Sequence, residues 1–273
     1  SIDNQLGPRL GFAWDVNGDS TFKVFGNAGR YFLALPNNVA IRGASASTFT
    51  REYFTYTGIA ADGTPTGLTP VPRTDGGSGA YSSNGEYGQP IDVAAFAPSD
   101  LKNMYQDEFI LGMEHALANN WMIGVKFTSR NLKSSVDDVC DPYTLMDAQG
   151  LTPENFVNGQ FIASNDAGKL YAVSYCYMFN PGGKNTFSLA ETDINGNPTG
   201  ARGEFVMTNE DWRFDQGLKR TYSGIDIYLE RPFDGKWEAR IDYTYSKSKG
   251  NMEGQVKSEL GQDNISKTQD WDA

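Results

Sequence analysis

Residue types that carry catalysis or bind metals are sparse in this sequence. His115 is the single histidine among 273 residues, so a site with several histidine ligands cannot form within the chain. A Ser-His-Asp triad would also depend on His115, and no Gly-x-Ser-x-Gly elbow is present. The two glycine-rich phosphate-binding patterns, that of the P-loop and that of the dinucleotide fold, are absent. The sequence therefore predicts no such enzyme chemistry, and we expect no cofactor.

Two acidic runs resemble the start of a calcium-binding loop, and they begin at Asp15 and Asp193. In the first run the twelfth position is Gly26, where a calcium loop needs a bidentate glutamate. In the second run Glu204 occupies the twelfth position, but Pro198 replaces the glycine of the sharp turn. Both runs are expected to be polar turns.

Three carboxylates, Glu52, Asp107 and Asp211, could in principle supply the acid pair of a glycoside hydrolase. The sequence gives no way to pair them, so we interpret them as solvated loop acids. The chain is therefore expected not to be an enzyme.

Aromatic residues in the expected loops are better candidates for a binding site. They include Tyr53, Tyr56, Tyr175, Tyr177 and Trp212. Tyrosine and tryptophan dominate recognition surfaces, so these rings could line the mouth of a substrate site. The alternative is that the long loops pack on themselves around the same rings.

The two cysteines, Cys140 and Cys176, fall in one expected loop region. They form a disulfide if the chain folds in an oxidising compartment, and otherwise they are two unrelated thiols. A bond between them would close a loop of about 36 residues and contribute roughly 3–4 kcal/mol on the chain-entropy view.

Charge and composition narrow the class of protein. The net charge is −11, which argues against binding to a nucleic-acid backbone, because such binders show a basic surface. Aromatic residues make up 13% of the chain and glycine contributes 30 residues, a composition typical of β-rich proteins with many turns. No apolar stretch is long enough for a transmembrane helix. Barrel strands remain possible, because only every second residue of such a strand must be apolar.

The elements that would position these residues are expected to be β-strands. Along the stretch 221–247, apolar residues alternate with polar or charged ones on both sides of the turn Phe233-Asp234-Gly235-Lys236. Since successive strand residues face opposite sides, this hairpin has one apolar and one charged face. Two further hairpins follow the same pattern around Asn17-Gly18 and Asn119-Asn120, both of which are turn signals.

The long stretches between the hairpins show less pattern. An aromatic-rich strand is expected at 47–57, followed by loop or disorder at 57–90. A short helix is expected at 153–158, with Thr152 as its N-cap and Pro153 in the first helical position. Strand-like runs occupy 170–179, 186–191 and 204–207.

The distribution of turns favours a membrane barrel over a soluble sandwich. Turns of about two to four residues lie at one end of the hairpins, and links of about 70 and 80 residues lie at the other. A sandwich usually has modest loops at both ends. Trp14, Trp121 and Trp237 each lie within three residues of a short turn, as in an aromatic girdle at the periplasmic membrane interface. The alternative is that they are core aromatics at the ends of sheets.

Three segments resemble known barrel hairpins. The stretch GPRLGFAWD at 7–15, with NGD at 17–19 and KVFGNAGRY at 23–31, is similar to a hairpin of TonB-dependent outer-membrane receptors, particularly the Oar-like group. YQDEF at 105–109 and RTYSGI at 220–225 are similar to later hairpins of that group. The resemblance implies a 22-stranded barrel, plugged by an N-terminal domain and energised through TonB. No segment of the sequence resembles the plug domain, the TonB box or the C-terminal closing strand of such a receptor. We therefore interpret the chain as an internal piece of a longer protein.

The resulting prediction is an all-β, antiparallel meander of long hairpins that forms part of a transmembrane β-barrel. Barrel hairpins are expected at 1–34, 106–136 and 217–249, long extracellular loops at 35–105 and 137–216, and a third loop with the start of another strand at 250–273. The expected function is substrate capture and energised uptake in a Gram-negative outer membrane. The expected partners are the lipid bilayer, the remaining strands and plug, TonB and an unknown substrate. Two alternatives are a secreted soluble β-protein that binds or cleaves carbohydrate, and a passive porin-like channel.

Overall fold

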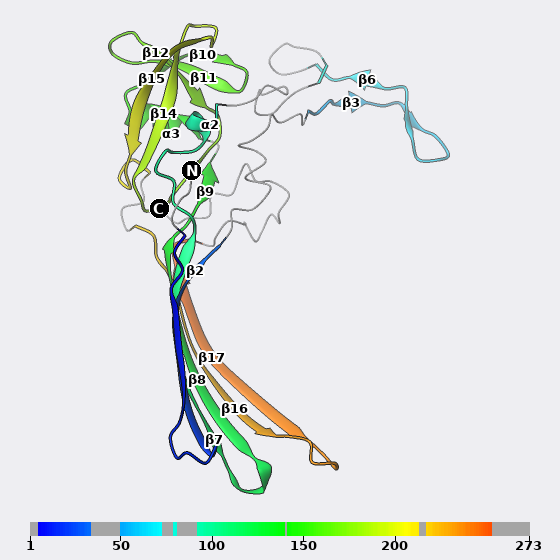
Figure 1. Ribbon diagram of the computed structural model, residues 1–273. Coiled ribbons are helices and arrows are strands. Elements are labelled where there is room, and N and C mark those ends of the chain that lie inside the picture. The colour runs from blue at the N-terminus through cyan, green and yellow to red at the C-terminus, as the bar shows by residue number, and fades with distance from the viewer. Residues whose placement is uncertain are drawn as a thin grey trace.

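The computed structural model describes residues 5–33, 50–72, 79–80, 92–139, 141–212 and 217–252. A long, curved sheet with short turns at its lower end bears the folded parts of the long links above its upper end (Figure 1). We call these two ends of the sheet the turn end and the loop end. No helix in the described part of the chain is long and apolar enough to cross a membrane.

Six strands form the curved sheet in the order β1-β2-β7-β8-β16-β17, and all neighbours are antiparallel. The strands are β1 (Arg9–Asp15), β2 (Phe22–Phe32), β7 (Tyr105–Ala116), β8 (Met122–Ser134), β16 (Arg220–Arg231) and β17 (Ala239–Gly250). The predicted antiparallel meander of three long hairpins is thereby confirmed. Within the described residues the sheet is open, with β1 and β17 as its edges.

The short turns are built by residues that tolerate left-handed backbone. In the first turn the Asp15 carboxylate accepts hydrogen bonds from turn N–H groups, that of Ser20 at 2.8 Å. The second contains the 3₁₀ turn η1 (Ala118–Asn120), where Asn119 and Asn120 have φ of 61° and 62°. Asparagine reaches this region more easily than most residues, so the chain reverses within a few residues.

The first long link contains only short elements in its described part. The two-residue strands β3 (Phe54–Thr55) and β6 (Thr69–Pro70) pair, as do β4 (Gly58–Ile59) and β5 (Pro65–Thr66). The single strand predicted at 47–57 is wrong over its described part, because the chain changes pairing partner within a few residues. The loop expected at 57–90 likewise contains β4, β5 and β6. Residues 47–49, 73–78 and 81–90 lie outside the described residues.

The second long link folds into a compact unit, which we call the loop domain (residues 137–139 and 141–212). Its main sheet has the strand order β10-β11-β12-β14-β15, and a second small sheet pairs β13 with β9. Its elements are β9 (Asp137–Val139), α3 (Pro142–Ala148), β10 (Thr152–Val157), β11 (Gln160–Ser164), β12 (Leu170–Ser174), β13 (Tyr177–Phe179), β14 (Asn185–Thr192) and β15 (Pro198–Met207). The three strand-like runs predicted here correspond to β12 with β13, to β14 and to part of β15.

The helix predicted at 153–158 is wrong, because this stretch is strand β10. Its neighbour in the sheet is β11, and the pairing shifts register between Pro153 and Asn155. Proline is tolerated at such an edge position with a bulge, so the apparent N1 proline was a strand residue. The actual helix α3 begins 11 residues earlier in the chain, at Pro142 instead of Pro153, where the Asp141 carboxylate caps the N–H of Thr144.

The core of the loop domain is aromatic and aliphatic. Tyr177, Phe179 and Phe187 are fully buried, and Trp212 is 5% exposed. The short helix α2 (Val93–Phe96) of the first link adds Ala95 to this core. Burial of these side chains removes apolar surface from water, which stabilises the loop domain.

Polar contacts also join the first link to the loop domain. The Asp100 carboxylate accepts hydrogen bonds from the backbone N–H and hydroxyl of Thr186, at 2.7 and 2.8 Å. Arg202 pairs with Asp92 at 2.7 Å. The end of the first link is therefore part of the same folded unit.

Candidate functional site: the polar face of the sheet and the loop domain

The long sheet has one apolar and one polar face, as the alternation predicts. Paired residues of antiparallel strands lie on the same face, so the register defines rows that run across the sheet. One apolar row consists of Phe12, Gly26, Leu111, Phe127, Ile225 and Tyr245. Many side chains of the apolar face are strongly exposed, among them Ile241 at 62% and Tyr243 at 61% in neighbouring rows. A face of this composition and length along the strands fits the hydrocarbon layer of a membrane.

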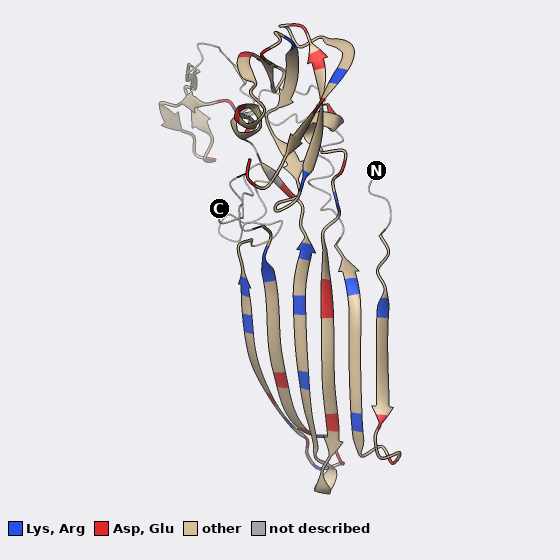
Figure 2. Ribbon diagram, turned by 90° about the vertical axis from the view of Figure 1, so that its left-hand side faces the viewer, with Lys and Arg blue, Asp and Glu red and all other residues tan. Residues whose placement is uncertain are grey.

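Charges on the polar face are balanced. Its cations are Arg9, Lys23, Lys126, Arg130, Arg220 and Arg240, and its acids are Asp15, Glu108, Glu114, Asp226, Glu230 and Asp242. Figure 2 shows blue and red segments along the same strands. Six charges of each sign suit a wet interior, whereas a dry core would need every one of them desolvated.

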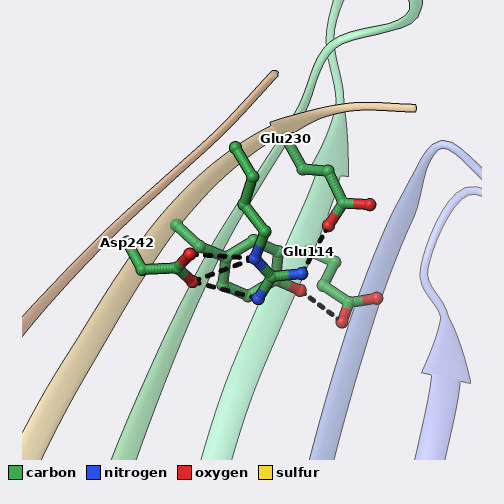
Figure 3. Close-up of polar contacts among 5 residues, drawn as sticks. Glu114, Glu230 and Asp242 are labelled. Atoms are coloured by element: carbon green, nitrogen blue, oxygen red, sulfur yellow. Dashed lines mark hydrogen bonds and ion pairs between the residues drawn. The ribbon is translucent and has the colours of Figure 1, made fainter. Parts of the chain in front are cut away.

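A continuous polar network lies near the turn end of this face (Figure 3). The Arg240 guanidinium bridges Glu230 at 2.8 Å and Asp242 at 2.9 Å. The Tyr228 hydroxyl donates to Glu114 at 2.6 Å, and Glu114 also pairs with Lys23. The Arg240 guanidinium lies 5.3 Å from the centroid of the Tyr228 ring, and this contact joins the two groups of bonds into one network from β2 to β17.

A second level of pairs follows toward the loop end. Lys126 pairs with Asp226 at 3.1 Å, and the Thr244 hydroxyl donates to the same carboxylate at 2.7 Å. Arg130 pairs with Glu108. These groups remain partly exposed, so each pair contributes little to stability and serves mainly to fix side-chain positions.

Glycines on this face make room for aromatic rings. A Cβ atom on Gly124 would lie 2.2 Å from Tyr228, and one on Gly112 would lie 2.3 Å from the ring of Phe25. Both pairs are direct cross-strand neighbours. The missing side chain lets the Tyr228 ring cross β8 and reach Glu114, so Gly124 positions the network.

The three tryptophans lie at the turn end. Trp14 is 59% exposed on the apolar face, and the rings of Trp121 and Trp237 meet edge to face at 5.9 Å. The Arg231 guanidinium stacks over the Trp237 ring at 3.9 Å. This arrangement is compatible with the predicted aromatic girdle, which we retain as a proposal.

Arg231 also binds Asp234 in the turn between β16 and β17. This hydrogen bond to Arg231 is the main reason that the pKa of Asp234 is lowered to about 2. Asp234 further accepts hydrogen bonds from the backbone N–H groups of Lys236 and Trp237. The turn is thus held by one carboxylate with several donors.

The aromatic residues predicted for a substrate mouth separate into two groups. Tyr53 and Tyr56 are exposed, and Tyr175 is half-buried at the surface of the loop domain. Tyr177 and Trp212 are buried in the domain core, so their assignment to a mouth is wrong. Burial raises the pKa of the Tyr177 phenol well above its usual value, and its hydroxyl donates to a backbone carbonyl at 2.7 Å. For these two rings, the alternative of a self-packed loop is correct.

A surface aromatic cluster, which the sequence analysis missed, surrounds Tyr175. Phe161 contacts Tyr143 at 5.3 Å and Phe156 at 4.8 Å between ring centroids, and it stacks with Tyr175 at 6.4 Å. Tyr143 is 53% and Phe156 42% exposed. Asn158-Gly159 is the hairpin signal that would have revealed Phe156 and Phe161 as cross-strand neighbours.

Only one of the two cysteines of the predicted disulfide lies within the described residues. Cys176 is disulfide-bonded and 4% exposed. Cys140, its predicted partner, lies outside the described residues, so the pairing of Cys140 with Cys176 stays a proposal.

The acidic runs act as turn caps. Asp193 accepts a hydrogen bond from the side-chain amide of Asn197 at 2.8 Å and from the backbone N–H groups of Asn197 and Asn195, both at 2.9 Å, and these bonds lower its pKa. Within the described residues no group of three or more His, Cys, Asp and Glu side chains could hold a metal ion. Asp107 is not a loop acid as predicted, because it lies in β7 and pairs with Arg30 at 2.8 Å.

Comparison with known proteins is consistent with this architecture. A family model described as an outer membrane beta barrel domain matches residues 1–273. The chain therefore belongs to the outer-membrane β-barrel family, and it lies in a bacterial outer membrane. It is similar to the TonB-dependent transporter Oar of Myxococcus xanthus, with 24% identity over 279 residues that cover 96% of this chain.

These findings confirm the predicted Oar-like barrel and its location. The chain spans 20% of the length of the Oar transporter. No solved structure matches the chain.

Proposed function

We propose that this chain forms part of the wall of a TonB-dependent receptor whose long links capture a substrate outside the cell before energised uptake. The observation that carries this proposal is the balanced, paired polar face, which fits a water-filled passage and no dry core. The similarity to a TonB-dependent transporter supports it. The partners would be the bilayer, the remaining strands, a plug domain and TonB, which would act through a segment beyond this chain.

The surface aromatic cluster is the proposed capture site. Tyr143, Phe156, Phe161 and Tyr175 form one patch on the loop domain, and exposed aromatic groups are frequent anchors in recognition. Phe161 packs against the buried core of the loop domain, which supports the patch from within. Pre-formed shape lowers the entropy that binding must overcome.

Uptake can be tested before the substrate is known. Three strains would be grown on the same complex medium: wild type, a deletion of the gene for this protein, and a deletion of TonB. We expect the first to deplete a compound that both deletion strains leave behind, measured by mass spectrometry of the medium. Depletion that needs this protein but not TonB would identify the passive channel instead.

The capture site can then be tested with the identified compound. The double variant Tyr143→Ala with Phe156→Ala should weaken its binding at the cell surface by roughly tenfold or more, because two exposed anchors are lost. Ile194→Ala is the matched control, since Ile194 is an exposed apolar residue of the same domain, 45% exposed and outside the cluster. Equal binding by both variants would place capture elsewhere.

A further inference from the structure

Most of the net negative charge of the chain lies in the loop domain. Residues 137–139 and 141–212 contain eleven acidic and three basic side chains, a net charge of −8 out of the −11 of the whole chain. Two of the three bases are already paired, Lys169 with Glu191 and Arg202 with Asp92, both at 2.7 Å. Since the polar face of the sheet carries equal numbers of both signs, the surplus of acids is concentrated beyond the loop end.

The surface aromatic cluster belongs to an acidic stretch of this domain. Between Lys133 and Lys169 the sequence contains six acids and no Lys, Arg or His. Tyr143, Phe156 and Phe161, three of the four rings of the cluster, lie within this stretch. Every charged side chain that the stretch itself can bring to the rings is therefore an acid.

Two exposed acids lie next to these rings along the chain. Asp147 follows Tyr143 by four residues in α3, and side chains at this spacing lie on the same side of a helix. Both of them are exposed. Glu154 is exposed two residues before Phe156 in β10, where its carboxylate accepts a hydrogen bond from the Ser164 hydroxyl at 2.6 Å. The cluster thus has acidic neighbours on two elements.

The charge and the apolar surface together define the class of ligand. An anionic ligand would be repelled, and a small hydrophilic cation would leave the exposed rings uncovered. A cation is attracted to the face of an aromatic ring, and carboxylates nearby strengthen this attraction. A peptide that carries basic side chains next to apolar ones satisfies both parts of the surface.

We infer that the surface aromatic cluster captures cationic, amphipathic peptides. Their apolar side chains would cover Tyr143, Phe156 and Phe161, and their basic side chains would lie toward Asp147 and Glu154. The inference rests on the proposed function, because it assigns a ligand class to the proposed capture site. The other acids of the loop domain would attract such a peptide from a distance, an effect that salt screens.

Peptide binding to the purified full-length protein tests the inference. The protein is placed in nanodiscs of phosphatidylcholine, which carry no net charge, and empty nanodiscs measure binding to the lipid alone. The probes are three fluorescent peptides of equal length, built from Lys-Phe-Gly, Glu-Phe-Gly and Lys-Ser-Gly repeats. By fluorescence anisotropy, we expect the Lys-Phe-Gly peptide to bind roughly tenfold more tightly than either of the others. Its Kd should rise as salt is added.

Two double variants address the two parts of the site. Asp147→Asn with Glu154→Gln removes the acidic neighbours, so it should weaken binding of the Lys-Phe-Gly peptide by roughly fivefold and reduce the dependence on salt. Tyr143→Ala with Phe156→Ala removes two exposed rings, so it should weaken binding by roughly tenfold. Heat-modifiable migration in gels confirms that the barrel of each variant is folded.

Asp166→Asn with Glu204→Gln is the matched control, since it removes two exposed acids of the same domain outside the cluster. Binding of the Lys-Phe-Gly peptide should be nearly unchanged in this control. A loss equal to that of Asp147→Asn with Glu154→Gln would overturn the inference, because it would show that only the total charge matters.

The other probes distinguish this inference from the proposed function. Equal binding of the Glu-Phe-Gly peptide would overturn the cationic class and leave capture by the rings intact. Equal binding of the Lys-Ser-Gly peptide would overturn the role of the rings in peptide binding. If no peptide binds, the peptide class is wrong, whereas energised uptake is decided separately by depletion of the medium.

Discussion

At the scale of single residues, Gly124 permits the longest polar connection across the sheet. In Gly124→Ala, the new Cβ would lie 2.2 Å from Tyr228, so the ring must move and its 2.6 Å bond to Glu114 is lost. We expect a destabilisation of about 1–3 kcal/mol from overpacking, measured by urea unfolding of the folded barrel in detergent. Gly11→Ala is the control, because its Cβ would meet no atom nearer than 3.4 Å. Equal stability of the two variants would contradict this role.

The Asp234 turn predicts a dependence on acid pH. Because Arg231 lowers the folded-state pKa of Asp234 from 3.8 to about 2, the stabilisation is complete above the unfolded pKa. It is lost as the pH falls from about 4 through about 2. The difference in melting temperature between wild type and Asp234→Asn should therefore be constant near neutral pH and shrink in this window. A difference that persists unchanged at pH 2 would argue against the contact.

At the scale of elements, the disulfide predicts the behaviour of the loop domain. If Cys176 pairs with Cys140, Cys176→Ser should make the loop domain sensitive to proteases and lower its stability by roughly 3–4 kcal/mol. Limited proteolysis on intact cells would measure this effect. Cys140→Ser should have an equal effect, and the double variant should add nothing further. Additive effects of the two single variants would exclude the pairing.

The elements also show where sequence reasoning succeeds and where it fails. The long hairpins were predictable because one apolar face repeats over many residues, and a register slip would move Ile241 or Tyr243 to the polar face. The loop domain was harder, since its buried rings, such as Tyr177, carry no periodic pattern in short strands. Pro153 satisfied the rule for a helix start, yet pairing with β11 overrode that local preference. Tertiary packing, which decides such cases, is not readable from a single segment.

At the scale of the whole molecule, one face of the sheet is expected to meet lipid and the other water. Two substitutions to arginine, one on each face, test this expectation. Leu111 lies on the apolar face and its neighbour Ile110 on the polar face, in a row with Asn27 and Thr128. Leu111→Arg should cost roughly 2–4 kcal/mol because the charge enters lipid, whereas Ile110→Arg enters the wet side and should cost little. Folding yield of the full-length barrel in liposomes compares them. The opposite order would reverse the assignment of the faces.

The pairing of charges along the polar face has a consequence for anything that moves past it. Each cation of the described pairs lies in contact with its acid, as Lys126 does with Asp226, so the field of each pair decays like that of a dipole. The described pairs thus offer many hydrogen-bonding groups, but their electrostatic potential is weak a few ångströms away. If this face lines the proposed passage, the described pairs would hydrate a solute of either sign without favouring cations or anions.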